Sequence, residues 1–322
     1  MSIRWGVCST IKAPTKDILR FVAYHLDAGA HRIWVYLDAE NGGAYNALDA
    51  HPNCTVINCN EAYWYRYFGD KPAKHQTRQS RNATRTLALA GEVDWLLHID
   101  VDEFLVSPGS VSDVLASLPE TVLSARVRPM EVLASATPMN RQMAFKAFLP
   151  NGDTRLDEVR ALYPTYGDYI IGGFISHLAG KIFVRTRAQD LTLRIHNAFR
   201  DQKRIQDEAE LEHMSLAHLH APDWETWLKN FDFRMANGAY GAKGTPVRAP
   251  DGGKITLHEF FNALIEHSGN DGLRHFFDEV CADTPMLRER LAERGLLRLH
   301  DLNLDAKVHH YFPDYRPLAA TV

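Results

Sequence analysis

Short apolar runs alternate with helix-forming segments along the first half of the chain, and this alternation constrains the fold most. Four apolar runs predict strands, at residues 3–9, 32–37, 55–58 and 95–99. Apolar residues recur at helical spacing after Pro14 and again over residues 76–90, and Gly29 and Gly91 mark the ends of these helices. Repeated strand–helix units predict an α/β fold with an open, mostly parallel sheet and helices on both faces.

The pattern changes after about residue 123. Short β runs follow at residues 124–128 and 181–187. From Asp223 onward the spacing predicts helices, at residues 224–236, 256–267, 273–281 and 286–294. We therefore expect a catalytic domain over residues 1–235 and a helical C-terminal extension over residues 236–322 that packs on it.

Polar residues stand at the ends of three predicted strands. Thr10 closes the first strand, Asp38 follows the second, and Asp100-Val101-Asp102 follows the fourth. In open α/β sheets, ligands bind outside the carboxyl ends of the strands. We expect these three polar groups to converge on one ligand site.

The run Trp95-Leu-Leu-His-Ile-Asp-Val-Asp-Glu-Phe-Leu105 places three carboxylates directly after a buried strand. Such charges repel one another and are costly to desolvate unless a cation lies between them. A divalent ion, Mn²⁺ or Mg²⁺, prefers oxygen ligands and keeps positions for phosphate oxygens. The run therefore predicts metal binding by Asp100 and Asp102, with a purely structural acidic turn as the alternative.

The same run resembles the D-x-D element of GT-A-fold glycosyltransferases, in the family 2 and family 92-like branch. The resemblance covers roughly residues 1–235 and is strongest over residues 95–105. It implies a GT-A-type fold and a nucleoside-diphosphate-sugar donor. It also implies that Asp100 contacts the ribose or reaches the metal through water, and that Asp102 binds the metal directly. Family members often add a histidine at a later strand end, which implies His220 as a third metal ligand.

Further donor contacts are predicted at Thr10, Asp38, Gln76, Arg81 and Lys181. Thr10 and Asp38 lie at strand ends, whereas Gln76 and Arg81 belong to the polar helix that starts near residue 76. Lys181 follows a glycine-containing loop and could neutralise phosphate charge. A solvated helix face and a solvated hairpin lysine are the structural alternatives.

A transfer that inverts configuration needs a carboxylate base for the acceptor hydroxyl. Glu131 follows a predicted strand beyond the acidic run and is the first choice, and Asp168 in Tyr166-Gly-Asp-Tyr169 is the second.

Composition limits the partners. The net charge is -4 without a long basic run, which argues against nucleic acid as a partner. The first residues do not form a signal peptide, and the four cysteines lack zinc-ligand spacing. We therefore expect a cytoplasmic protein, with peripheral association at the inner face of the membrane compatible with these features.

The function that these observations predict is a metal-dependent glycosyltransferase of polysaccharide or glycoconjugate synthesis. It would move a sugar from a nucleoside-diphosphate-sugar, a UDP-sugar in first place, to a hydroxyl of a saccharide or glycoconjugate acceptor, with inversion. A nucleotidyltransferase is the first alternative, although the segment Cys8–Pro14 lacks the glycine-rich loop that holds a triphosphate. A non-catalytic carbohydrate-binding protein is the second, and the intact D-x-D run argues against it.

Overall fold

The computed structural model describes residues 2–135, 142–188, 190–238, 240–243, 246–248 and 253–316. The chain forms two units, each assembled from segments that are distant in the sequence. Unit 1 contains Met1–Arg128, Ala179–Leu216 and Asn303–Val322, and unit 2 contains Pro129–Leu178 and Ala217–Leu302. The division expected at residue 235 falls inside unit 2, within α8 (Phe231–Asn237).

Unit 1 is built on a sheet whose first four strands are parallel. They are β1 (Trp5–Ile11), β2 (Arg32–Leu37), β3 (Cys54–Asn58) and β4 (Trp95–His98), in the order β4-β1-β2-β3. β8 (Lys181–Arg185) continues the sheet antiparallel to β4, and the first residues of β6 (Ser124–Val132) pair antiparallel with β8. β5 (Glu103–Val106) pairs with β12 (Glu208–His218).

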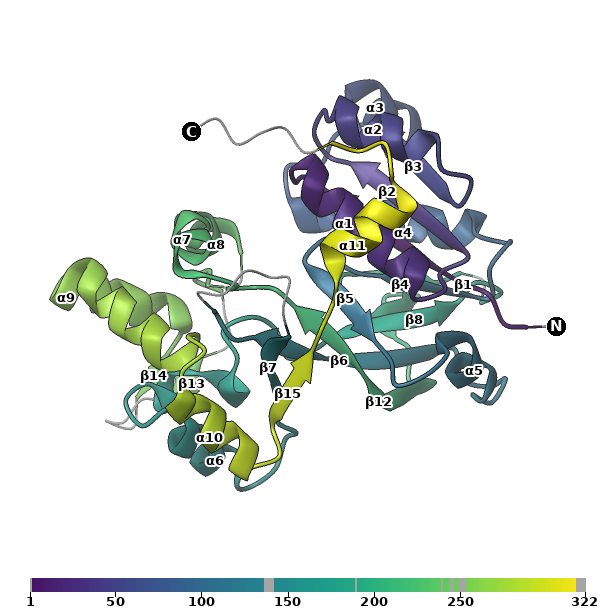
Figure 1. Cartoon of the computed structure of the whole chain (residues 1–322). Coiled ribbons are helices and arrows are strands. Elements are labelled where there is room, and N and C mark those ends of the chain that lie inside the picture. Colours follow the sequence, from purple (N-terminus) through teal and green to yellow (C-terminus); the bar gives the residue numbers. More distant parts are fainter. Residues whose placement is uncertain are drawn as a thin grey trace. The chain divides into compact units, whose positions relative to one another are not determined.

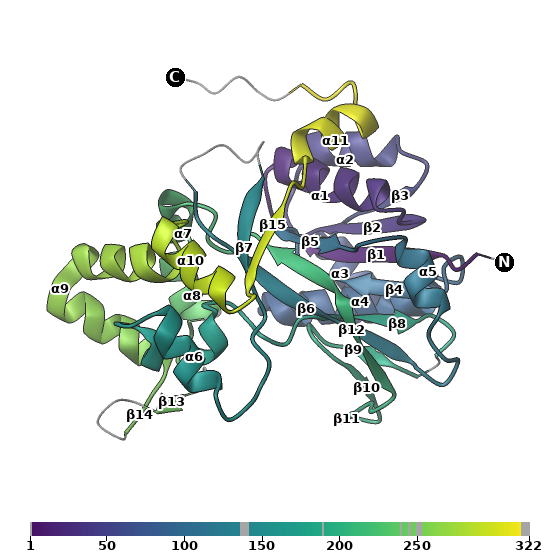
Figure 2. The same cartoon turned by 60° about the horizontal axis from the view of Figure 1, so that its bottom comes forward.

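Side chains of these strands are buried on both faces of the sheet. Val7 of β1 and Val35 of β2 share a core with α1 (Thr15–Asp27) and α2 (Gly42–Asp49), whereas their neighbours Cys8 and Trp34 face α3 (Glu61–Phe68) and α4 (His75–Leu89). Figure 2 shows α1 and α2 on one side of β1 and β2 and α4 on the other. The predicted α/β class, with a sheet covered on both faces, is confirmed.

Three smaller parts complete unit 1. α5 (Val111–Ala116) begins after Ser110, whose Oγ accepts from the Asp113 amide at 3.2 Å. α11 (Leu304–Tyr311) lies beside α1 (Figure 1), and Arg20 donates two hydrogen bonds of 2.6 and 2.8 Å to Asp305. The final helix therefore belongs to the same unit as the first strand. A small sheet of β9 (Thr192–Leu193), β10 (Ala198–Arg200) and β11 (Lys203–Arg204) is also part of unit 1.

Unit 2 holds most of the predicted C-terminal helices. They are α7 (Trp224–Lys229), α8, α9 (Leu257–Val280) and α10 (Pro285–Glu293), joined by α6 (Arg155–Leu162) and the short helices η1 (Gly167–Tyr169) and η2 (Ile171–Gly173). Its strands are β7 (Met143–Ala147), β15 (Leu297–His300), β13 (Val247–Arg248), β14 (Lys254–Ile255) and the end of β6. The core is rich in aromatic rings such as Trp227 and Phe276.

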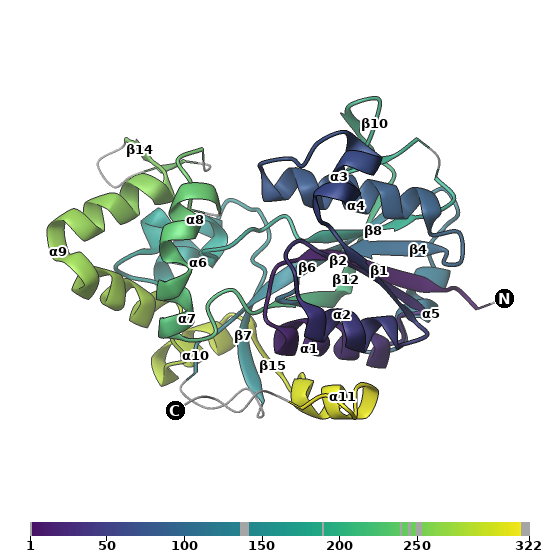
Figure 3. The same cartoon turned by 90° about the horizontal axis from the view of Figure 1, so that it is seen from above.

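One helix of unit 2 joins two predicted helices. The sequence predicts separate helices at residues 256–267 and 273–281, but α9 runs through both and bends between them (Figure 3). Gly269 makes the bend, with φ 56° and ψ −144°, a conformation that glycine adopts readily because it has no Cβ. No helix within the described ranges is both long enough and apolar enough to cross a membrane.

Candidate functional site

Unit 1 brings the predicted strand-end residues to one edge of the sheet. Thr10 pairs with Tyr36 in the register of β1 and β2, and the Asp38 amide donates to the Ile11 carbonyl at 2.8 Å. On the other side of β1, the Ile99 amide donates to the Cys8 carbonyl at 3.3 Å, so Asp100 follows directly at the same edge. Neighbouring parallel strands end together here, which is where open α/β sheets bind their ligands.

One face of α4 covers this edge and binds all three strand ends. His75 and Arg78 hold Asp38, Gln79 donates to Asp100 Oδ1, and Asn82 Nδ2 donates to Thr10 Oγ1 at 3.0 Å. These four residues follow the i, i+3, i+4, i+7 spacing that places side chains on one face of a helix. The helix thereby fixes the relative positions of Thr10, Asp38 and Asp100.

The Asp38 carboxylate is buried and is used through one oxygen. Oδ2 accepts from Arg78 Nε and Nη2 at 2.9 and 2.7 Å and lies 3.2 Å from His75 Nδ1. Burial raises the pKa of Asp38, but the hydrogen bonds and charges of His75 and Arg78 outweigh it and hold the pKa below its ordinary value. Oδ1 is buried without a hydrogen-bond partner in the described part of the chain. A buried carboxylate oxygen in this state is suited to accept an N–H or O–H group from a ligand.

The Asp100 carboxylate is held from two sides. Gln79 donates to Oδ1, and the Lys181 ammonium lies 2.5 Å from Oδ2. The same ammonium lies 3.3 Å from Glu103 Oε2, which also accepts the Asp100 amide at 2.8 Å. Burial lowers the pKa of Lys181, but the Asp100 and Glu103 carboxylates outweigh it and raise the pKa above its ordinary value. A charged, fully buried lysine is therefore an integral part of the acidic cluster.

Asp102 lies in the turn between β4 and β5 and is half-buried. The pKa of Asp17, in the first turn of α1, is raised mainly by burial, and the negative charge of Asp102 contributes to this rise. Asp102 and Asp100 are both half-buried, and Asp100 accepts side-chain hydrogen bonds from Gln79 and Lys181.

His98, the last residue of β4, is buried next to this cluster. Burial first, and then the nearby Lys181 charge, lower the pKa of His98 to about 4, so the ring is neutral at ordinary pH. Neither ring nitrogen has a hydrogen-bond partner within the described residues. A neutral imidazole adds no positive charge to the carboxylates, and Lys181 supplies the cation in their midst.

The residues Gln76 and Arg81 lie on a different face of α4 from Arg78 and Gln79. Both line a groove of about 830 Å³ that α4 forms with residues 192–197 and Phe199. Arg81 also pairs with Asp70 at 3.6 Å. The helix thus separates the predicted donor contacts into two sets, one at the strand ends and one in the groove.

Glu131, the first predicted catalytic base, forms a buried ion pair in unit 2. Its Oε2 lies 2.9 Å from the ammonium of Lys146, and its Oε1 accepts the Ser176 amide at 2.8 Å. Burial raises the pKa of Glu131, but Lys146 and the Ser176 hydrogen bond outweigh it and hold the pKa below its ordinary value. These surroundings are those of a structural ion pair, and the assignment of Glu131 as a base stays a prediction.

Asp168, the second predicted base, lies in η1 of unit 2. It accepts a hydrogen bond of 2.7 Å from Arg160 Nε, and its side chain is 25% exposed. This surface ion pair does not test the catalytic role of Asp168, and the assignment of Asp168 as a base also stays a prediction.

His220, the predicted third metal ligand, is buried in unit 2. Its Nε2 lies 2.8 Å from the Tyr240 hydroxyl, which also accepts from Trp227 Nε1 at 2.9 Å. Burial first, and then the Arg234 charge, place the pKa of His220 well below its ordinary value. The ring is neutral, as a metal ligand must be, but one of its nitrogens is engaged with Tyr240.

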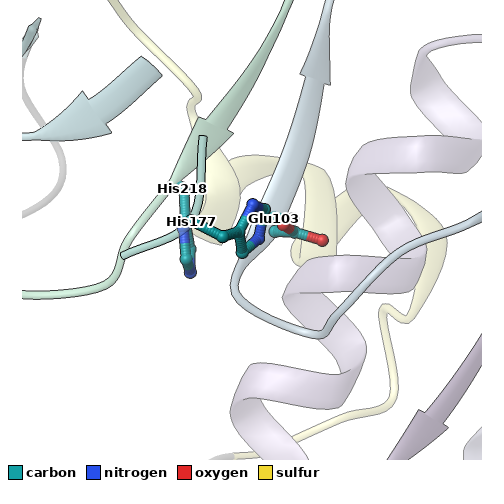
Figure 4. Close-up of side chains that lie close together, drawn as sticks. All are labelled: Glu103, His177 and His218. Atoms are coloured by element: carbon teal, nitrogen blue, oxygen red, sulfur yellow. The ribbon is translucent and has the colours of Figure 1, made fainter. Parts of the chain in front are cut away.

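Two further histidines of unit 2 lie side by side (Figure 4). His218 ends β12, and the centroid of its ring lies 5.4 Å from that of His177. A ring nitrogen of each lies within 4.8 Å of one on the other. Two imidazoles this close can share a transition-metal ion. The sequence did not mark His177 as a metal-binding candidate. It is a single histidine in a loop, and about forty residues separate it in the sequence from His218.

The carboxylates of unit 1 are of the chemical kind that divalent cations bind. Asp100, Asp102 and Glu103 supply hard carboxylate oxygens in and next to the turn after β4. Two carboxylates, those of Asp100 and Glu103, share the Lys181 ammonium, and Asp102 follows Asp100 by two residues in the turn. The chemistry of these groups is therefore compatible with a metal at Asp102 and Asp100. The prediction that His220 completes the site joins residues of different units and stays a prediction.

Comparison with known proteins gives limited likenesses. A scan against protein-family models gives no match, and a search among curated proteins gives none either. Among solved structures, the chain is similar to the WbbM bifunctional glycosyltransferase in its apo form, with 15% identity over 58% of this chain and a TM-score of 0.29. The chain spans about a third, 32%, of that structure's length.

Two other solved structures are similar at the same level. HddC from Yersinia pseudotuberculosis matches with 8% identity over 58% of this chain and 78% of that chain, at a TM-score of 0.30. A mycobacterial protein matches with 11% identity over 79% of this chain and 82% of that chain, at a TM-score of 0.34. At these identities and TM-scores the likenesses indicate no function.

Proposed function

We propose that the chain is a metal-dependent glycosyltransferase that uses a nucleoside-diphosphate-sugar donor, a UDP-sugar in first place. The observation that carries this proposal is that side chains of α4 donate hydrogen bonds to Thr10, Asp38 and Asp100 at the carboxyl edge of the parallel strands. A buried carboxylate for a nucleoside and an acidic cluster for a cation lie at this one edge. A nucleoside diphosphate can use both kinds of contact, the first through its base or ribose and the second through a cation on its phosphates.

Asp38 is the proposed nucleoside contact. Its Oδ2 is held by Arg78 and His75, which fixes the carboxylate in place and leaves Oδ1 to accept from a base N–H or a ribose hydroxyl. The pKa of Asp38 lies below its ordinary value, so the group is a charged acceptor at neutral pH. Hydrogen bonds to charged acceptors are about twice as strong as neutral ones, which suits a group that selects a ligand.

Asp102 and Asp100 are the proposed metal-binding residues. A divalent cation held there would neutralise the charge that develops on the departing diphosphate. Lys181 and Gln79 orient Asp100 through its two oxygens, and Asp102 follows two residues later in the turn. Asp100 is thus positioned before any ligand arrives, so that binding need not order it.

The acceptor is proposed to be a hydroxyl of a saccharide or glycoconjugate, and the transfer is proposed to invert configuration. Glu131 and Asp168 are the predicted bases that would take the hydroxyl proton. The ion pair with Lys146 makes Glu131 a weaker base than an ordinary glutamate, since it holds the pKa low. Asp168, with a partly exposed side chain, can be reached from solvent.

Calorimetry with UDP tests the proposal directly. UDP is titrated into the wild-type protein with Mn²⁺ and, separately, with EDTA, and the same pair of titrations is made on Asp102→Asn. The matched control is Glu120→Gln, whose carboxylate is 86% exposed and lies outside the cluster. We expect Mn²⁺ to tighten UDP binding in the wild type and the control, and to have little effect on Asp102→Asn.

Equal UDP affinity with Mn²⁺ and with EDTA in the wild type would contradict the metal-dependent proposal. Turnover distinguishes the enzyme classes. A labelled UDP-sugar with a saccharide acceptor yields a labelled glycoside and UDP from a glycosyltransferase, whereas a nucleotidyltransferase yields pyrophosphate from a nucleoside triphosphate and a sugar phosphate.

A further inference from the structure

A groove in unit 1 runs along the face of α4 that is opposite to the strand-end site. Its volume is about 830 Å³, and its walls are α4, Phe68, residues 192–197 and Phe199. Figures 2 and 3 show β10 on the same side of the sheet as α3 and α4. Pockets of about 300–1,000 Å³ are the size that holds small-molecule ligands. The groove is therefore large enough for a ligand of several sugar rings.

Three arginines line the groove, and each lies over an aromatic ring. The guanidinium carbon of Arg81 is 5.5 Å from the ring centroid of Phe68, that of Arg85 is 4.0 Å from Tyr67, and that of Arg194 is 4.1 Å from Phe199. Stacking on a ring fixes the plane of a guanidinium and leaves its N–H groups at the rim. The three cations are thus oriented without being neutralised by the rings.

Other contacts of these arginines use a minority of their donors. Arg85 donates to the Tyr36 hydroxyl, and Arg194 Nη2 donates to Gln202 Oε1 at 2.9 Å. Arg81 pairs with the exposed Asp70 at 3.6 Å, outside the groove lining. A guanidinium carries five N–H donors, so each arginine keeps several for a ligand. The lining residues, all within the described ranges, include no carboxylate.

The wall opposite α4 is held firmly in place. Arg126 is 2% exposed and donates to the carbonyls of Ala179 and His196 at 2.6 and 3.1 Å and to Asn197 Oδ1 at 2.8 Å. On the helix side, Thr84 Oγ1 accepts the Leu193 amide at 2.9 Å. A groove fixed from both walls loses little conformational freedom when a ligand binds.

We propose that this groove binds an anionic saccharide. A guanidinium matches a carboxylate or a phosphate group with two parallel hydrogen bonds, and three such groups lie along one groove. Hydroxyl and amide groups also line the groove and suit sugar hydroxyls; they belong to Gln76, Thr77, Ser80, Thr84 and Asn197. The overall charge of -4 disfavours a polyanion as large as nucleic acid. The ligand's role as the acceptor glycan, but not its binding, rests on the proposed function.

Calorimetry with three glycans tests the proposal. The probes are an oligogalacturonate, which is carboxylated, a phosphorylated mannan oligosaccharide, and a neutral mannan oligosaccharide of matched length. They are titrated into the wild type, Arg194→Gln and Arg85→Gln. The control is Arg187→Gln, since Arg187 is 53% exposed, pairs with Glu120 and lies outside the groove. Arg194 is exposed, so its substitution leaves the fold intact even if Arg85→Gln disturbs the contact with Tyr36.

We expect at least one anionic glycan to bind the wild type and the control, more weakly as salt increases, and the neutral glycan not to bind. Each groove substitution should weaken that binding about tenfold, the loss of one charge-assisted contact. The relative strength of the two anionic probes then identifies the carboxylate or the phosphate as the recognised group. Binding of the neutral glycan as tight as the anionic ones, or unchanged affinity of Arg194→Gln, would overturn the proposal.

The two proposals fail separately. UDP binding with Mn²⁺ is measured on the same variants, and we expect Arg194→Gln to bind UDP as the wild type does. If the wild type binds the anionic glycan but not UDP, the proposed function is wrong, and the proposal that the groove binds an anionic saccharide is supported. If UDP without metal displaces the glycan from the wild type, the groove is a nucleotide site and the present inference is wrong.

Discussion

The lysine inside the acidic cluster gives the sharpest test of how this site is held together. Lys181 is fully buried and contacts Asp100 and Glu103, and Glu103 is fully buried as well. Lys181→Met keeps the bulk of the side chain and removes its charge, so both carboxylates lose their cation. Removing one partner of a buried pair costs about 3–5 kcal/mol. Because the Asp100 side chain remains 29% exposed and can be hydrated, we expect a loss of about 3 kcal/mol.

Urea unfolding followed by circular dichroism measures this loss, first in EDTA and then with Mn²⁺. A cation that binds only the native state at a hundred times its dissociation constant adds about 2.7 kcal/mol. We expect Mn²⁺ to stabilise Lys181→Met more than the wild type, because the ammonium no longer competes for the carboxylates. The raised pKa of Lys181 means that its contribution is fully present below about pH 10.4, the ordinary lysine value, and is lost as the pH rises through the higher folded-state value.

Lys307→Met is the control, since Lys307 pairs with Asp27 at the surface of the same unit. A surface pair contributes about 0–1 kcal/mol, so this variant should keep nearly all of its stability. The reasoning is refuted if Lys181→Met unfolds at the same urea concentration as the wild type in EDTA. It is also refuted if the difference between the two proteins disappears at pH 7 and is present only above pH 10.

Three further predictions follow from the described contacts. Asp38→Asn should weaken UDP binding in calorimetry and destabilise the protein by about 1.5–3 kcal/mol, because Arg78 loses a charged partner. Since the pKa of Asp38 is lowered in the folded protein, this stability difference should be fully present above about pH 3.9 and be lost as the pH falls through the lower folded-state value. A stability difference that does not change with pH would contradict the ion pair. Burial lowers the pKa of His25 in α1 to about 4. The free energy of unfolding of the wild type should therefore fall by about 3 kcal/mol between pH 6.5 and pH 4, and that of His25→Leu should not show this fall. Urea unfolding with the same pH dependence for both proteins would exclude this. Glu131→Gln leaves Lys146 buried without its carboxylate and should lower the free energy of unfolding by about 3–5 kcal/mol. The double variant Glu131→Leu with Lys146→Met should recover most of that stability, because it leaves no buried charge unpaired. Equal unfolding midpoints for the single and the double variant would show that the ion pair does not stabilise this part of unit 2.

The sequence alone determined the four parallel strands of unit 1 and the polar residues at their carboxyl ends. The strands of residues 32–37 and 95–99 were predictable because they are continuous apolar runs, which is what burial on both faces requires. The placement of Thr10, Asp38 and Asp100 at one edge followed from the parallel order, because parallel strands end together. These are local signals, and they do not depend on which distant segments pack nearby.

Only the tertiary structure decided how those residues are partnered. Lys181 lies beside Asp100 and Glu103 because β8 runs antiparallel to β4 and brings its first residue to the strand end, and its contact with a diphosphate stays a prediction. Gln76 and Arg81 line the groove because of the helical rotation between residues 76 and 79, and their contacts with the nucleotide stay predictions. The final helix joins unit 1 through Arg20 and Asp305, which are 285 residues apart. Pairings over such separations depend on how whole elements pack, and no local pattern of residue types encodes them.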